Sequence, residues 1–107
     1  MDAQLRALSD PTRLAILRAL ARGERQAGEI AAAFPVSRPA ISHHLKVLSD
    51  AGLVRMRRSA QSRLYSIDAR AVRDLRSRFD RFWDDALPRL KAVVEADRRA
   101  KRSRGAR

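Results

Sequence analysis

The apolar residues of this chain recur at helical spacing up to residue 51 and again after residue 68, and between these limits they alternate. Residues 53–58 and 63–67 place apolar side chains at every second position over most of their length, and the polar residues 59–62 separate the two runs. Alternation on both sides of a short polar turn is the pattern of a β-hairpin. The sequence therefore predicts a mainly α-helical fold that contains one small β-hairpin.

Proline, glycine and capping residues divide the helical part into four helices before the hairpin and one long helix after it. Asp10 can cap the second helix with Pro11 at its first position, and Ser37 can cap the fourth. Pro88 lies within the apolar pattern of the last helix and should kink or break it around residues 84–87. The predicted order is helix, helix, helix, helix, strand, strand, helix, with the helices at about 3–8, 11–22, 27–33, 38–51 and from 69 onwards.

The length of the chain and the composition of its end indicate one domain followed by a tail. A chain of 107 residues is a common size for one domain and too short for two. From Arg98 onwards there is no large apolar residue. We therefore expect one folded domain over residues 1–97 and a disordered basic tail over residues 98–107.

Several functional classes are excluded by what the sequence lacks. The chain has no cysteine, which excludes disulfides and thiolate metal sites. Its longest apolar run, Ile30 to Phe34, is far shorter than the roughly 20 residues of a membrane span. With no signal peptide at its start, the sequence predicts a cytoplasmic protein without a membrane partner. Ser42 and His43 are adjacent with no acid to orient the imidazole, and the glycines stand singly, so the sequence does not predict an enzyme.

The positive charge of the chain is concentrated in two segments. The formal net charge is +12. Residues 36–66 hold six basic side chains and one acid, and residues 98–107 hold six basic side chains and no acid. This distribution favours a polyanionic partner, with nucleic acid as the first candidate. For the tail alone, a solvated charged surface is an equally open interpretation.

The third and fourth predicted helices, with the short turn between them, have the arrangement of a helix-turn-helix. Rotation by about 100° per residue places Ile41, Leu45 and Leu48 on one buried face of the fourth helix. The opposite face, its flanks and its N-terminal end are then free to meet DNA. Arginine there can bind guanine through two hydrogen bonds, and a lysine further along suits a phosphate. The candidate DNA contacts of this helix are Arg38, Pro39, Ala40, Ser42, His43 and Lys46.

The hairpin that follows is rich in arginine and suits a wing that lies along the DNA backbone or in the minor groove. Arg58, Gln61 and Arg63 are nearest its tip and are the predicted wing contacts, together with Arg57. Arg55 is left out of this set because strand alternation can turn its side chain away from DNA.

Two segments resemble the ArsR/SmtB family of bacterial winged-helix repressors. The run from Leu8 to Leu17, Leu-Ser-Asp-Pro-Thr-Arg-Leu-Ala-Ile-Leu, resembles the opening signature of that family, and Ser42 to Val54 resembles its recognition helix and the entry into its wing. The resemblance covers about residues 5–95. It implies a homodimer paired through its first and last helices, which binds an imperfect palindromic operator in double-stranded DNA and blocks transcription. It also implies that Ser37, Arg38, Ser42, His43 and Lys46 occupy DNA-facing positions.

The chain departs from the metal-sensing members of that family. The segment that matches their cysteine-bearing motif, Gly28 to Ala33, has no cysteine, and no histidine follows His44. Asp80, Asp84 and Asp85 offer only hard oxygen ligands, which bind soft or borderline ions poorly. The sequence therefore predicts no metal site and no cofactor. The run Phe82-Trp83-Asp84 instead resembles a non-metal branch that contains autorepressors of small operons.

The last helix has a wider apolar face than one small domain needs. A soluble monomer could not expose this face as one continuous patch, whereas two copies related by a two-fold axis would bury it. The same symmetry would place two recognition helices about 34 Å apart and require an inverted repeat in the DNA. The predicted dimerisation residues are Leu5, Leu8, Val72, Leu75, Phe79, Phe82, Trp83 and Leu90.

The sequence thus predicts a sequence-specific DNA-binding regulator that acts as a homodimeric repressor. The alternative is a basic, chromosome-associated protein that binds DNA without regard to sequence. A winged helix that serves protein–protein contact is disfavoured by the arginines of the hairpin. The sequence does not indicate the operator, or whether a small molecule or protein acts as an effector.

Overall fold

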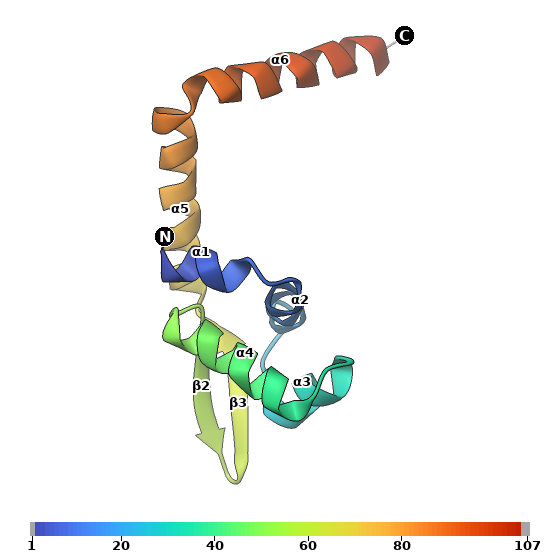
Figure 1. The fold of residues 1–107 in the computed structure, drawn as a ribbon, viewed down its shortest axis with the longest axis vertical. Coiled ribbons are helices and arrows are strands. Elements are labelled where there is room, and N and C mark those ends of the chain that lie inside the picture. The colour runs from blue at the N-terminus through green and yellow to red at the C-terminus, as the bar shows by residue number, and fades with distance from the viewer. Residues whose placement is uncertain (1, 106–107) are drawn as a thin grey trace. The chain divides into compact units, whose positions relative to one another are not determined.

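Residues 2–105 are described by a computed structural model, which contains helices and one small antiparallel sheet (Figure 1). The mainly helical fold with a β-hairpin is therefore confirmed. The elements are α1 (Ala3–Leu8), α2 (Pro11–Leu20), β1 (Arg25–Gln26), α3 (Ala27–Ala33), α4 (Arg38–Asp50), β2 (Val54–Ser59), β3 (Ser62–Ile67), α5 (Ala69–Ala86) and α6 (Pro88–Gly105).

The chain divides into two compact units, an N-terminal unit of residues 1–72 and a C-terminal unit of residues 73–107. The boundary lies within α5, and the sequence placed a domain boundary instead at residue 97. None of the helices within residues 2–105 is long and apolar enough to cross a membrane.

The helices of the N-terminal unit begin at side-chain caps. One carboxylate oxygen of Asp10 accepts hydrogen bonds from the backbone N–H groups of Thr12 (2.8 Å) and Arg13 (3.1 Å), and Pro11 takes the first position of α2. Ser37 Oγ accepts from the N–H of Ala40 at 3.2 Å and caps α4. These caps satisfy N–H groups that have no partner within the helix. Both predicted caps are confirmed.

The sheet has the strand order β1-β3-β2, with both pairings antiparallel. Ser59 faces Ser62 in the register of β2 and β3, so Ala60 and Gln61 alone form the hairpin turn. Ala60 has a positive φ of 55°, in the left-handed region. The strand β1 was not predicted, because a pair of residues is too short to show alternation. It adds Arg25 and Gln26 to the free edge of β3, opposite Tyr65 and Leu64.

The core of the N-terminal unit is formed by one face of each helix and the start of the hairpin. Leu14 lies outside this core and exposes 38% of its surface. It lies two positions before the buried Ile16, which is about 200° around α2 and therefore on the other face. The predicted buried face of α4 is confirmed. The buried apolar residues are Ala7, Ile16, Leu20, Ile30, Ile41, Leu45, Leu48, Leu53 and Val54.

In the C-terminal unit, the predicted break before Pro88 is confirmed, since α5 ends at Ala86 and α6 begins at Pro88. The expected disordered tail is wrong for residues 98–105, where α6 continues to Gly105, whereas residues 106–107 lie outside the described residues. The lack of large apolar side chains removes packing, but arginine, lysine and alanine have high intrinsic helix propensity. The long last helix, which Pro88 was expected to kink or break, consists of the two helices α5 and α6.

Candidate nucleic-acid interface

The helix α4 presents a polar surface opposite its buried face. The side chains of Ser37, Arg38, Pro39, Ser42, His43 and Lys46 are exposed, and Ala40 is half-buried. The positive end of the helix dipole is also directed outwards at the first turn of α4. The N–H of Ala40 there is bonded to Ser37 Oγ, and Pro39 has no N–H. This end of α4 is therefore suited to an anion or to the hydrogen-bond acceptors of a base edge.

A groove of about 600 Å³ separates α4 from the hairpin and brings residues of both elements together. Arg38, Ser42 and Lys46 line it from α4, and Arg63 and Tyr65 line it from β3. Candidate contacts from two elements that are distant in sequence therefore line one surface. Arg38 and Lys46 from α4 and Arg63 from β3 give the groove positive charge from both elements.

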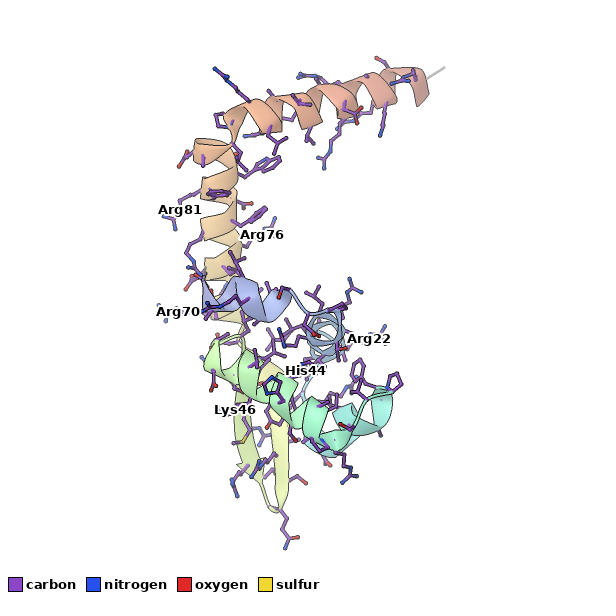
Figure 2. The ribbon with its side chains drawn as sticks, viewed as in Figure 1. Arg22, His44, Lys46, Arg70, Arg76 and Arg81 are labelled. Carbon is purple, nitrogen blue, oxygen red and sulfur yellow. The ribbon has the colours of Figure 1, made fainter. Side chains whose placement is uncertain are left out.

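Lys46 is labelled on α4 in Figure 2. It forms an ion pair with Asp50, with a distance of 3.1 Å between Nζ and Oδ2. Both side chains are mostly exposed, and pairs of this type contribute only tenths of a kcal/mol. The ammonium of Lys46 can therefore leave Asp50 for a phosphate at little cost.

At the tip of the hairpin, two arginines face each other without a counter-charge. Arg58 of β2 and Arg63 of β3 are directly opposite in the register, and both are exposed. None of the ion pairs within residues 2–105 involves Arg38, Arg58 or Arg63. Like charges at opposed positions of a sheet destabilise it. An external anion at the tip, beside the exposed Gln61, would relieve this repulsion.

Arg57, which the sequence placed among the DNA contacts, is held by an acid of the same chain. Its Nε and Nη2 donate to the carboxylate of Glu24 at 2.8 and 2.7 Å. This two-point contact raises the pKa of Arg57 and lowers the pKa of Glu24, in both cases through the hydrogen bonds first. Arg57 therefore ties the hairpin to the connection between α2 and β1.

Arg55, which the sequence left out of the DNA contacts, also has a partner within the chain. Its Nε donates to Asp68 at 3.0 Å. The pKa of Asp68 is lowered first by the hydrogen bond from the backbone N–H of Ala71 and then by Arg55. Asp68 therefore holds both the start of α5 and the base of the hairpin.

A contact that sequence reasoning missed joins α4 to the junction of α1 and α2. Arg13 donates from Nε to the carbonyl of Ala7 (2.6 Å), from Nη2 to the carbonyl of Arg6 (3.3 Å) and from Nη1 to Nδ1 of His44 (3.2 Å). A guanidinium has no acceptor, so Nδ1 of His44 must accept. His44 of α4 is thus a hydrogen-bond acceptor for the guanidinium of Arg13. No periodic pattern in the sequence connects two residues 31 positions apart.

No group of three or more histidine, cysteine, aspartate or glutamate side chains within residues 2–105 is placed to hold a metal ion. The rings of His43 and His44 have centroids 6.0 Å apart and planes inclined by 54°. In the C-terminal unit, Asp84 contacts Lys91 at 2.6 Å and raises its pKa, and Asp80 lies 3.9 Å from Arg76. Asp80 and Asp84 thus have basic neighbours.

The predicted dimerisation residues differ in exposure within the single chain. In α5, where no residue is buried, Phe79 and Phe82 each expose 56% of their surface. Leu75, Trp83 and Leu8 are half-buried. The remaining members, all exposed, are Leu5, Val72 and Leu90.

Comparison with known proteins identifies relatives over most of the chain. Residues 10–56 match the profile of the bacterial regulatory protein arsR family. An HTH-type transcriptional regulator of Mycobacterium tuberculosis is 43% identical over 96 residues, which is 90% of either chain. The transcriptional repressor SdpR of Bacillus subtilis is 40% identical over 74 residues, covering 69% of this chain and 82% of the repressor.

Solved structures of similar proteins have the same fold. The crystal structure of a possible transcriptional regulator for arsenical resistance is 42% identical, with a TM-score of 0.72 over 87% of this chain and 96% of the other. The homodimeric winged helix-turn-helix DNA-binding domain of a possible ArsR-family regulator from Mycobacterium bovis is 33% identical, with a TM-score of 0.63 over 79% of each chain.

Proposed function

This chain belongs to the ArsR family of bacterial transcriptional regulators, which bind DNA and are not enzymes, and from that premise we propose how it reads its operator. In this proposal, α4 enters the major groove and the β2–β3 hairpin lies along the adjacent backbone. The protein acts in the bacterial cytoplasm as a homodimeric repressor.

The observation that carries this assignment is that Arg38 of α4 and Arg58 and Arg63 of the hairpin are exposed and take part in no ion pair within residues 2–105. Arg38, at the exposed N-terminal end of α4, reads base edges together with Ser42. Lys46 binds a phosphate after leaving Asp50. Arg58, Gln61 and Arg63 contact the backbone or the minor groove from the tip of the hairpin. Arg57 is assigned to positioning the hairpin, because Glu24 occupies its guanidinium.

The half-sites of the operator follow from the proposed dimer. The exposed apolar residues of α5 need a cover, and a second copy provides an identical face. The homodimeric relative from Mycobacterium bovis supports this pairing. Two-fold symmetry of the protein then requires two-fold symmetry of the site, with recognition helices about one turn of DNA apart.

Regulation without a bound metal is the second part of the proposal. Cysteine is absent from the chain, and both histidines lie on α4, where His44 is bonded to Arg13. The acids of the C-terminal unit can offer a metal ion only oxygen ligands, and Asp84 is paired with Lys91. Release from the operator is therefore assigned to changes in protein level, a small organic ligand or a protein partner.

Selection of bound duplexes from a random pool at physiological salt tests the proposed function. We expect enrichment of an imperfect inverted repeat with wild-type protein, and a relaxed preference within each half-site with the Arg38→Ala variant. Retention of DNA without any enriched sequence would favour the alternative, a chromosome-associated protein that does not read sequence.

A further inference from the structure

The last two turns of α6 carry the densest positive charge in the chain. Residues 98–104, called here the α6 basic segment, contain five basic side chains and no acid. All of them are helical and exposed. The segment lies beyond residues 10–56, the part that matches the family profile, so the reading of DNA by α4 and the hairpin does not account for it. Its basic residues are Arg98, Arg99, Lys101, Arg102 and Arg104.

Contacts within the described residues neutralise little of this charge. Lys101 pairs with Asp97 at 3.3 Å on the exposed surface, and Nε of Arg104 donates to the carbonyl of Ala100 at 3.5 Å. Arg98, Arg99 and Arg102 take part in none of the ion pairs within residues 2–105. Basic residues three and four positions apart on a helix repel one another. Repulsion among its own basic side chains therefore destabilises the helix in this segment.

Packing does not explain the segment either. No residue of α6 is buried, and the positions between the basic side chains hold only Ala100 and Ser103. A helix that is polar on all sides contributes nothing to a core, and it is a marginal helix when it is isolated. A partner that supplies negative charge would stabilise it.

The spacing of the charges fits a nucleic-acid backbone. At a rise of about 1.5 Å per residue, the segment places five positive charges along roughly 10 Å of helix axis. Double-stranded DNA carries one negative charge per about 1.7 Å of its axis, or roughly six over the same length. Arginine, which supplies four of the five charges, binds phosphate through two parallel hydrogen bonds.

We propose that the α6 basic segment binds the phosphate backbone of DNA, as a contact that is independent of sequence and separate from α4 and the hairpin. The inference rests on the proposed function in one respect, because a chain that already binds DNA holds phosphates at high local concentration. Such a contact raises affinity for every duplex and leaves the preferred sequence unchanged.

The test replaces Arg98, Arg99, Arg102 and Arg104 together by glutamine in the full chain and measures the salt dependence of binding to a random-sequence duplex of 40 base pairs. Each lost phosphate contact lowers the slope of log affinity against log salt by about 0.9, so we expect a slope shallower by about 3 to 4 per chain. Hydrogen exchange of the amides of residues 98–105 should also slow when the duplex is added to wild type and not to the variant.

Two matched variants separate a direct contact from general charge. Lysine at the same four positions keeps the charge and should keep the salt slope. Glutamine at Arg70, Arg73, Arg76 and Arg81 removes the same charge from exposed positions of α5 and should change the slope by less than about 1. A change as large in the α5 variant as in the α6 variant would overturn the proposal.

A variant of the N-terminal unit distinguishes the two proposals. If Arg38→Gln with Arg63→Gln lowers DNA affinity and the α6 variant does not, the inference on α6 is wrong and the proposed function stands. If neither variant changes binding, the proposed function fails as well. Sedimentation with anionic phospholipid vesicles adds a further outcome, since binding of the segment to vesicles with no effect on DNA would assign it to a membrane surface and overturn the proposal.

Discussion

At the scale of single residues, the arginines around the hairpin and α4 differ in what they contact. Glu24 binds Arg57 and Asp68 binds Arg55, so these two guanidinium groups hold the hairpin in place. Arg38, Arg58 and Arg63 take part in no ion pair within residues 2–105. The arginines that are bound to an acid of the same chain position the hairpin, and the arginines without such an acid can bind DNA.

Substitution of Arg38 and of Lys46 should weaken DNA binding in different ways. Arg38→Ala should lower affinity for the selected operator by about 1–3 kcal/mol relative to random DNA, because a base contact is lost. Lys46→Ala should lower affinity equally for both duplexes and reduce the salt slope by about 1. Titration of each variant with both duplexes checks this assignment, and an equal loss on both duplexes for Arg38→Ala would contradict the base contact.

The carboxylate of Asp68 should make stability depend on acid pH. Its pKa is lowered from the usual 3.8, so its contribution is present above that value and is lost as the pH falls through the lower folded-state pKa. Asp68→Asn keeps an oxygen that can cap α5 and removes the charge that faces Arg55. We expect a lower Tm for the variant at pH 7, and a difference from wild type that shrinks as the pH falls below the usual carboxyl range. A constant difference at all pH values would show that the ionised form is not what stabilises the fold.

At the scale of elements, the sequence predicted those helices and strands that are determined by residues close together in the chain. The cap at Ser37 and the buried positions Ile41 and Leu48 define α4 within one segment, and alternation defines the hairpin. The strand β1 and the contact between Arg13 and His44 depend on residues far apart in the chain, which leave no periodic signal. The helical residues 98–105 have no apolar periodicity that would indicate a helix, although arginine, lysine and alanine have high helix propensity.

Removal of the carboxylate of Glu24 should free the hairpin and change how it meets DNA. In Glu24→Gln, the two-point contact with Arg57 is lost, so amides of β2 and β3 should exchange faster with solvent. The released guanidinium should also steepen the salt slope of binding to random DNA by about 1. In the wild-type background, Arg57→Gln should reduce that slope less than Arg58→Gln does. Equal reductions would place Arg57 on the DNA in spite of its ion pair.

At the scale of the whole molecule, regulation by soft metal ions is not expected. The chain has no cysteine, and Lys91 binds Asp84. Micromolar zinc, cadmium or arsenite should leave the complex with the selected operator intact in a fluorescence anisotropy titration. Stoichiometric release by any of these would contradict the proposal, and variants of Asp80, Asp84 and Asp85 would then identify the ligands.

The dimer is the property on which the symmetry of the operator depends. Phe79 and Phe82 expose more than half of their surface in the single chain, and Trp83 lies next to them on α5. Aromatic anchors dominate interfaces of this kind, so Phe79→Ala or Trp83→Ala should weaken dimerisation by about 3–5 kcal/mol. Met56→Ala, which truncates an exposed apolar side chain of the hairpin, is the control and should leave the dimer intact.

Light scattering on wild type, on the Phe79→Ala/Trp83→Ala double variant and on the Met56→Ala control measures the mass of each directly. Since one protomer contacts only one half-site, the double variant should bind an isolated half-site as wild type does, and should lose the added affinity of the second half-site. This comparison separates dimerisation from folding, because a misfolded variant would lose half-site binding too. A wild-type chain that is monomeric and still binds an inverted repeat tightly would refute the dimer, and with it the argument that the symmetry of the protein sets the symmetry of the operator.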